Sequence, residues 1–239
     1  MILTFLALAL LLVLVLRIFE RRWPASTAES DWRKNLIAYL LFAGAQICLL
    51  PLVSLNPVAE RFALIDLASW SLIPAALAYL VLMDLAEFAF HRAQHAIPFL
   101  WRMHSLHHSD PNMNATTTVR HFWGDPLLKA VTIWPAVALI LKPTPAVLIV
   151  YGAISLYHYF IHANLPVSFG RWSWLLNHPA YHRRHHSSEP EHFDSNFASL
   201  FPIFDWICGT YRRPEGFPPT GLERQPRSLT DLALWPLRA

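Results

Sequence analysis

The sequence predicts an all-α protein in which multi-pass transmembrane helices carry a cytosolic, histidine-rich helical cap. Hydrophobic residues make up 54% of the 239 positions and charged residues only 15%, whereas soluble domains usually carry about 25% charged residues. The apolar residues gather in long uncharged runs, and all 13 histidines follow the third run, between residues 91 and 192. The same composition excludes a disordered chain.

Three transmembrane helices are expected in the N-terminal segment, residues 1–90. Residues 1–16 carry no charge, and a spanning helix needs about 20 mostly apolar residues, so this run is extended to Phe19. Positive charge follows the run instead of preceding it, which favours an uncleaved anchor over a secretory signal. The second span is expected at about residues 36–55 and the third at about residues 67–90.

A histidine-bearing segment, residues 91–212, comes next, and a polar tail, residues 213–239, completes the chain. Two shorter apolar runs predict a helical hairpin in the membrane at about residues 127–162. Residues 142–145 separate these runs and contain two prolines, which break helices and predict a tight turn.

The distribution of basic residues predicts the orientation of the chain. Only Arg61 and Lys142, 2 of the 19 lysines and arginines, fall on the predicted outer side. The positive-inside rule therefore places residues 17–35, 91–126 and 163–239 in the cytosol. Basic cytosolic loops also explain the net charge of +3, so no nucleic-acid partner is expected.

The cysteine and glycine content excludes a disulfide framework and three common kinds of binding site. Cys48 and Cys208 are too few for a disulfide framework or a cysteine-based zinc cluster. The seven glycines include neither a G-x-G-x-x-G nor a G-x-x-x-x-G-K pattern, which excludes a dinucleotide fingerprint and a P-loop.

Ten of the histidines form four groups with helical spacing, two of type H-x3-H and two of type H-x2-H-H. The groups are His91 and His95; His104, His107 and His108; His158 and His162; and His182, His185 and His186. Positions i, i+3 and i+4 share one helix face, so each group can direct its imidazoles at one point. Imidazole binds iron, zinc, copper and nickel, and ten ligands exceed what one ion takes. The pattern therefore predicts two metal ions, and iron with nitrogen ligands and open positions suits dioxygen chemistry.

A single helix-end histidine at a membrane interface would be read as a surface group. Four spaced groups on one side of the membrane favour metal binding instead. His121 and His178 are open between further ligands, substrate contacts and surface groups, and His192 is expected to be solvated.

Asp84 lies on the same helix face as His91 and His95. A carboxylate near the membrane boundary is costly unless it is paired. We expect it to accept a hydrogen bond from a ligand imidazole and so to fix the tautomer of that ring, the alternative being a solvated interfacial acid.

From about residue 80 to residue 212, the chain resembles the membrane-bound fatty acid hydroxylase / sterol desaturase superfamily. Three segments of this chain look like the three histidine boxes of that superfamily. They are His91-Arg-x-x-His95, His104-x-x-His107-His108-Ser109 and His182-Arg-x-His185-His186-Ser187. Further matches are residues 161–164, 194–197, 204–206 and 209–211.

The resemblance implies a centre of two non-haem irons on the cytosolic side, with O2 as co-substrate and two electrons supplied from outside. It carries over as ligands His91, His95, His104, His107, His108, His162, His182, His185 and His186. His158 completes a pair similar to that of the fatty acid 2-hydroxylases. Asn196 falls in a matching stretch and is expected beside the ligands, or binding water.

The expected reaction is hydroxylation or desaturation of an unactivated C–H bond in a lipid of the sterol or fatty acyl class, which enters from the bilayer. A separate donor of the ferredoxin or cytochrome b5 type is expected to supply the electrons. Arg183 and Arg184 are candidates to dock an acidic donor or anionic headgroups, or are solvated.

Two other functions remain open at this point. A zinc-dependent membrane hydrolase would use some of the same histidines to activate water, but would need far fewer of them. A metal transporter or sensor would carry ionisable residues inside its spans, and the first two predicted spans have none in their middles.

Overall fold

The computed structural model describes residues 2–27 and 32–238. The description leaves out Met1, residues 28–31 and Ala239. These residues belong to the predicted first span, the predicted first cytosolic segment and the predicted tail. The described chain is mostly helical, which agrees with the predicted all-α class.

The N-terminal elements are α1 (Ile2–Arg22), α2 (Trp32–Cys48), α3 (Leu50–Val53), α4 (Asn56–Ala59), β1 (Ile65–Asp66) and α5 (Leu72–Ala96). The middle elements are α6 (Pro98–His108), the 3-10 turn η3 (Ala115–Val119), α7 (Asp125–Val131), α8 (Ile133–Ile140), β2 (Leu141–Lys142), α9 (Pro145–Ser155) and α10 (Tyr157–Ile161). The C-terminal elements are α11 (Pro179–His185), α12 (Ile203–Cys208), α13 (Leu229–Ala233) and α14 (Trp235–Arg238). Short 3-10 turns lie at η1 (Glu60–Phe62), η2 (Leu67–Ser69), η4 (Gly170–Trp172) and η5 (Pro190–His192).

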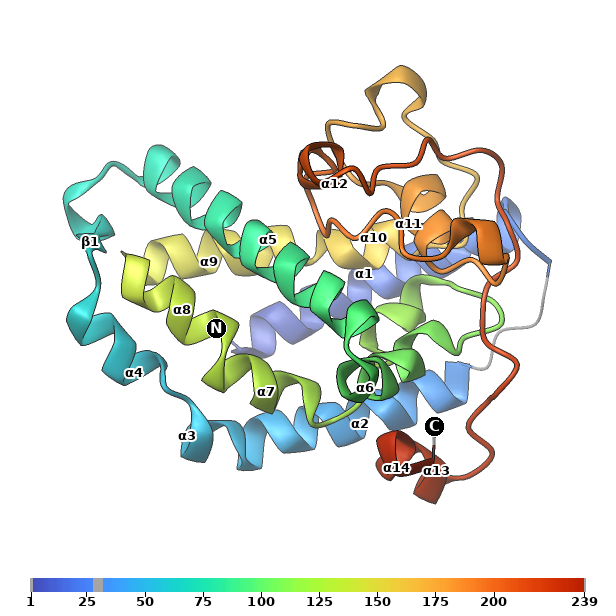
Figure 1. The fold of residues 1–239 in the computed structure, drawn as a ribbon, viewed down its shortest axis with the longest axis horizontal. Helices are drawn as coiled ribbons and strands as arrows, with labels where there is room; N and C mark the ends of the chain where they lie inside the picture. Colours follow the sequence, from blue (N-terminus) through green and yellow to red (C-terminus); the bar gives the residue numbers. More distant parts are fainter. Residues whose placement is uncertain (1, 28–31, 239) are drawn as a thin grey trace.

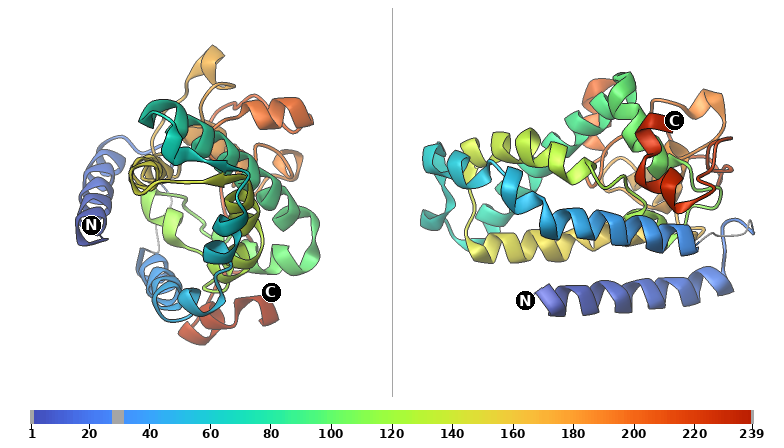
Figure 2. Two further views of the ribbon diagram at one scale, coloured as in Figure 1. Left: turned by 90° about the vertical axis from the view of Figure 1, so that its left-hand side faces the viewer. Right: turned by 90° about the horizontal axis from the view of Figure 1, so that it is seen from below.

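The long helices run side by side, with the short helices α3 and α4 at one end and the loops and short helices of the C-terminal part gathered at the other end (Figure 1). Helices α6 and α11 lie at this end, while the β1–β2 pair lies at the opposite end. Figure 2 shows α1 at the edge of the bundle in both of its views. The bundle therefore presents one end on which loops and helix ends can build a site.

Helix α5 is the central element of this arrangement. It begins at Leu72, not at the predicted residue 67, because residues 67–69 form a separate 3-10 turn. It ends at Ala96 because Ile97 precedes a proline and takes an extended conformation, and Pro98 then starts α6 at a position where no backbone N–H is needed. Both His91 and His95 thus belong to the same long helix.

Among the described residues, α5 is the one helix that is long and apolar enough to cross a membrane. The segment Pro145–Ile161 is apolar but shorter than a span. The multi-pass topology stays a prediction.

Helices flank the predicted turn on both sides, and the turn lies where the prolines are; that these helices form a hairpin in the membrane stays a prediction. Helix α8 ends at Ile140, and α9 begins at Pro145 with the Thr144 hydroxyl accepting a hydrogen bond from the Val147 N–H. Between them β2 pairs in parallel with β1, with Asp66 beside Lys142 and an ion pair of 3.2 Å between their side chains. This pair joins the turn to the segment that leads into α5.

Two apolar clusters hold the helices together. Tyr79 and Met83 of α5 pack with Val137 of α8 and Val147 of α9. The C-terminal segment forms the second cluster, because Trp235 is fully buried against α2 and α6, and its indole N–H donates to the Ser105 hydroxyl at 2.8 Å. The predicted polar tail is therefore packed onto the helix that carries the second histidine box.

Candidate metal centre

Two groups of histidines converge at the loop end of the bundle. Within each group, one ligand atom from every residue lies within 4.8 Å of the others. The first group, called site A, contains His91, His95, His104, His108 and His185. The second group, called site B, contains His107, His162, His182 and His186.

Helical periodicity explains why α6 serves both sites. His104 and His108 are four residues apart on one face and point to site A, whereas His107 lies beside that face and points to site B. The pair on α5 has the same i, i+4 spacing and meets the α6 pair in site A. The two sites are therefore neighbours along the same face of α6.

The histidines of each site approach one another most closely through their Nε2 atoms. In site A, His104 Nε2 lies 3.0 Å from His91 Nε2 and 3.2 Å from His108 Nε2. In site B, His162 Nε2 lies 3.1 Å from His107 Nε2 and 2.9 Å from His182 Nε2.

The opposite ring nitrogens of three of these histidines donate to backbone carbonyls. His91 Nδ1 lies 2.7 Å from the Phe197 oxygen, His185 Nδ1 lies 2.9 Å from the Ser195 oxygen, and His162 Nδ1 lies 2.8 Å from the His158 oxygen. A carbonyl can only accept, so each Nδ1 carries the proton and each Nε2 presents a lone pair. A metal ligand needs this tautomer.

Several ring nitrogens in the two sites are buried and have no protein partner, among them His185 Nε2 and His186 Nε2. Burial also keeps the rings neutral, since it lowers the pKa of His185 to about 4 and the pKa of His182 well below its usual value. Buried, neutral imidazoles with unused lone pairs are the donor set that a transition metal satisfies. The residues present therefore fit one metal ion in each site.

One loop, residues 194–197, contacts histidines of site A through their Nδ1 atoms. Ser195 and Phe197 supply the two carbonyls, and Asp194 places a carboxylate oxygen 3.3 Å from His95 Nδ1. Asn196 lies between them with φ of 60°, a left-handed conformation that asparagine tolerates better than most residues. Its side chain accepts from the Arg212 N–H and donates to the Arg212 carbonyl, so it fixes the loop and contacts no ring nitrogen of either site.

Asp84 differs from the expectation for it. Its carboxylate accepts hydrogen bonds from the Leu200 and Phe201 N–H groups, at 2.9 and 2.8 Å, and not from an imidazole. The expectation used helix periodicity alone, which places Asp84 on the same helix face as His91 and His95. Periodicity cannot show that the backbone of a loop more than 100 residues later hydrogen-bonds to this carboxylate. Asp84 therefore acts on site A through the loop that carries the Phe197 carbonyl.

Asp205 was not singled out from the sequence, although it lies in a stretch that matched the superfamily. It is fully buried, and its carboxylate accepts from the Phe197 and Ala198 N–H groups, the Thr210 hydroxyl and the Tyr181 hydroxyl. It is thus the main anchor of the supporting loop. Its position two residues into a helix, after Pro202, gave no signal of this role.

The ring of His158 lies outside both sites, and its backbone carbonyl orients His162. The ring of His121 stacks on His107 with centroids 4.3 Å apart, but is in neither site. His178 caps α11, with its Nδ1 accepting from the Tyr181 N–H. His192 is half-buried and hydrogen-bonded to the Ser187 hydroxyl instead of being fully solvated.

The sequence made Arg183 a candidate to dock a partner or to be solvated, but the structure buries it. It is 2% exposed, because its side chain crosses the interior and donates to the Pro218 carbonyl and the Asn164 side chain. Its neighbour Arg184 is half-buried.

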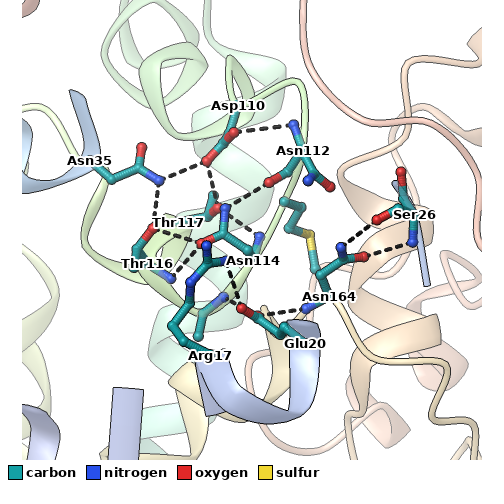
Figure 3. Close-up of polar contacts among 12 residues, drawn as sticks. Arg17, Glu20, Ser26, Asn35, Asp110, Asn112, Asn114, Thr116, Thr117 and Asn164 are labelled. Atoms are coloured by element: carbon teal, nitrogen blue, oxygen red, sulfur yellow. Dashed lines mark hydrogen bonds and ion pairs between the residues drawn. The ribbon is translucent and has the colours of Figure 1, made fainter. Parts of the chain in front are cut away.

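Helices α1 and α2 are joined to the histidine elements by buried polar contacts (Figure 3). Glu20 is 3% exposed, and one of its oxygens accepts from the Ala115 and Asn164 N–H groups, at 2.7 and 2.8 Å. Asn35 of α2 donates to Asp110, which follows α6. Because Asn164 follows His162 by two residues, Glu20 fixes the backbone next to site B.

Two cavities adjoin the sites. An outer cavity of about 280 Å³ touches both of them and is lined by His95, Trp101, His108, His185, His186, Ser187, Phe193, Asp194 and Leu222. An inner cavity of about 160 Å³ also touches both and extends between α5, α7, α9 and α10.

Comparison with known proteins places these features in context. A sequence model described as "Fatty acid hydroxylase" matches residues 76–210, more than half of the chain. An alkylglycerol monooxygenase from Xenopus tropicalis is 33% identical over 129 residues, and one from Homo sapiens is 31% identical over 131 residues. Each match covers 54% of this chain but only 28% of the relative, so the similarity spans little more than a quarter of those proteins.

A third relative is similar over a longer stretch. An ornithine lipid hydroxylase from Rhizobium tropici is 26% identical over 218 residues, which cover 84% of this chain and 65% of that protein. No solved structure matches the chain.

Proposed function

This chain belongs to the fatty acid hydroxylase family, and on that premise we propose that it is an integral-membrane, di-iron lipid hydroxylase. The proposed reaction converts a C–H bond of a lipid to C–OH, with O2, two electrons and two protons consumed and one water released. The convergence of nine neutral imidazoles on two adjacent points is the observation that carries this proposal.

The proposed metal ligands are the five histidines of site A and the four of site B. The histidines of each site leave coordination positions of an octahedral iron open, which suits O2 chemistry. A structural zinc takes four ligands, fewer than the five histidines of site A. Bound there, two irons would supply the reduction of O2 and the oxidation of the C–H bond.

The protein's own residues position and protect the centre. The Phe197, Ser195 and His158 carbonyls hold three imidazoles in one tautomer and orientation, so the donor set is preorganised. We propose that the inner cavity holds the reacting carbon beside the histidines of both sites.

The two cavities suggest separate routes for lipid and electrons. The inner cavity extends between helices that expose large apolar side chains, among them Leu77 and Leu85 of α5 and Ile149 of α9, and we propose that lipid enters from this side. The outer cavity is lined by histidines of both sites and by the exposed Asp194, and we propose that the external electron donor approaches there.

Metal analysis tests the proposal. Protein expressed with iron-57 and purified in mild detergent should contain close to two irons per chain, with a coupled Mössbauer signal. His185→Ala should lose the iron of site A and His107→Ala the iron of site B, whereas His192→Ala, a histidine in neither site, should keep both. One tightly bound zinc and no iron, after iron-replete expression, would contradict the proposal and favour a hydrolase.

A further inference from the structure

Most residues that line the inner cavity carry a polar group, and metal binding explains only some of these groups. Five of its 14 lining residues are histidines of sites A and B. The rest include Glu87, Gln94, Lys129, Tyr151 and His158, and Ile161 is the one aliphatic residue. A cavity built for a plain hydrocarbon chain would be lined by apolar side chains.

An ion pair lies in this lining, in helices that the sequence places within the membrane. Lys129 Nζ is 2.7 Å from a Glu87 oxygen and 3.6 Å from an Asp125 oxygen, and the Lys129 side chain is only 18% exposed. Such a pair is costly to desolvate, and ionisable residues at membrane depth are commonly functional. An ammonium group has three N–H donors, so two carboxylates leave one for a ligand.

The size of the cavity limits what part of a lipid it can hold. A cavity of about 150 Å³ accommodates one benzene molecule. The inner cavity, at about 160 Å³, therefore holds roughly six to ten non-hydrogen atoms, which is a short fragment of a lipid. A polar fragment there can hydrogen-bond to the side chains of the lining, which an alkyl fragment cannot do, so a polar fragment is favoured.

A smaller cavity of about 30 Å³ adjoins the inner cavity. It shares Glu87, Tyr151, His158 and Ser199 with the inner cavity and adds three aliphatic side chains. These are Leu80, Ile154 and Leu200. It also adds Asp84, Ser155 and Tyr157, so aliphatic side chains are more frequent here than beside the histidines, but polar ones remain.

We propose that the Glu87–Lys129 pair binds a hydrogen-bonding group of the substrate, such as a hydroxyl, ester or amide. The oxidised carbon then lies within a few bonds of that group, and the substrate is a lipid modified next to its polar part, not in mid-chain. This inference rests on the proposed lipid hydroxylation.

Binding without turnover provides the first test. The probes are 1-hexadecylglycerol, 1-palmitoylglycerol and N-palmitoylethanolamine, with hexadecane as the apolar comparison. The readout is the thermal shift of the protein as purified in detergent, whatever its metal content. The double variant Glu87→Gln/Lys129→Met removes both charges, so no buried charge is left unpaired. We expect at least one polar probe to bind more tightly than hexadecane, and the double variant to bind it about tenfold more weakly.

The chain offers a matched control for this variant. Asp66→Asn/Lys142→Met removes an exposed ion pair at the far end of the same hairpin and should leave probe binding unchanged. Iron content measured on both double variants shows whether the two sites remain filled. The inference is overturned if no polar probe binds better than hexadecane, or if both double variants bind the polar probe like the wild type.

The position of the product hydroxyl provides the second test. Protein in vesicles of mixed polar lipids is given 18O2 and a chemical reductant, and products are mapped by fragmentation mass spectrometry. Label within about three carbons of a heteroatom supports the inference, and label in mid-chain or at the methyl end overturns it. Absence of bound iron or of any labelled product would instead count against the proposed function, and the binding test would still decide the inference.

Discussion

The hydroxyl of Tyr181 donates a hydrogen bond of 2.5 Å to the carboxylate of Asp205. Tyr181 lies on α11, one residue before His182, and Asp205 holds the loop whose carbonyls orient His91 and His185. This contact therefore joins the helix that carries the third histidine box to the loop that supports site A.

Asp205→Asn should weaken site A. An amide nitrogen replaces one carboxylate oxygen and cannot accept, so the loop loses buried hydrogen bonds and unfolding should become easier by about 2–4 kcal/mol. Iron affinity at site A should fall roughly 10- to 100-fold, as for other groups that orient metal ligands. Denaturant unfolding and iron titration measure the two effects. Asp231→Asn makes the same chemical change on the surface of α13 and should leave iron binding intact.

Glu20→Ala should loosen the attachment of α1. The backbone N–H groups of Ala115 and Asn164 would lose their acceptor, and two unsatisfied buried donors cost about 2–6 kcal/mol together. Glu20→Gln keeps an oxygen that can accept both bonds and should lose much less stability. Chemical unfolding in one detergent compares the three proteins. Equal losses in the two variants would show that the ion pair with Arg17, not the backbone clamp, is what matters.

His178 should make stability depend on pH. Burial lowers its folded-state pKa to about 4, while its pKa in the unfolded chain is about 6.5, so between these values the unfolded chain binds the proton more tightly. Acidification from pH 6.5 towards pH 4 should therefore cost stability, by up to about 1.4 kcal/mol per pH unit for this group, and no cost is expected above pH 6.5.

His178→Asn isolates this effect, because asparagine can cap α11 without titrating. The other histidines titrate in both proteins and largely cancel in the difference. The free energy of unfolding, measured at pH 7, 6 and 5, should fall more with decreasing pH for the wild type than for the variant. A difference that is constant over this range would exclude His178 as the source.

Trp235→Ala should strongly destabilise the packing of the C-terminal segment on α2 and α6. Removal of a fully buried indole costs about 3–5 kcal/mol, whereas Trp235→Phe should cost less because most of the packing remains. Leu237→Ala, at a position that is 82% exposed on the same helix, should change stability by less than about 0.5 kcal/mol. Thermal unfolding monitored by circular dichroism distinguishes these cases.

Local patterns predicted the parts of this structure that depend on local physics. Helix periodicity placed the histidines of each box on common faces, and the prolines at residues 143 and 145 marked the hairpin turn. The boundary of α5 was less accurate, since residues 67–69 are apolar yet form a separate turn.

The supporting contacts could not be predicted in the same way. Glu20 and Asn164 are separated by 144 residues, and Asp84 and Leu200 by 116, so no periodicity links them. The H-x3-H spacing of His158 and His162 suggested that both rings face the metals. The ring of His162 belongs to site B, however, and the ring of His158 does not; the contact that His158 makes with the site is its backbone carbonyl, which accepts from His162 Nδ1.

The composition of site A has a consequence for biosynthesis. Four of its histidines come from residues 91–108, but His185 and the Ser195 and Phe197 carbonyls come from the last quarter of the chain, and Asp205 and Arg212 hold those carbonyls in place. A nascent chain on the ribosome therefore cannot complete this site until it has been translated and released well past residue 212. Iron supplied earlier would meet only a partial set of ligands, so the centre is expected to mature only after residue 212 has left the ribosome.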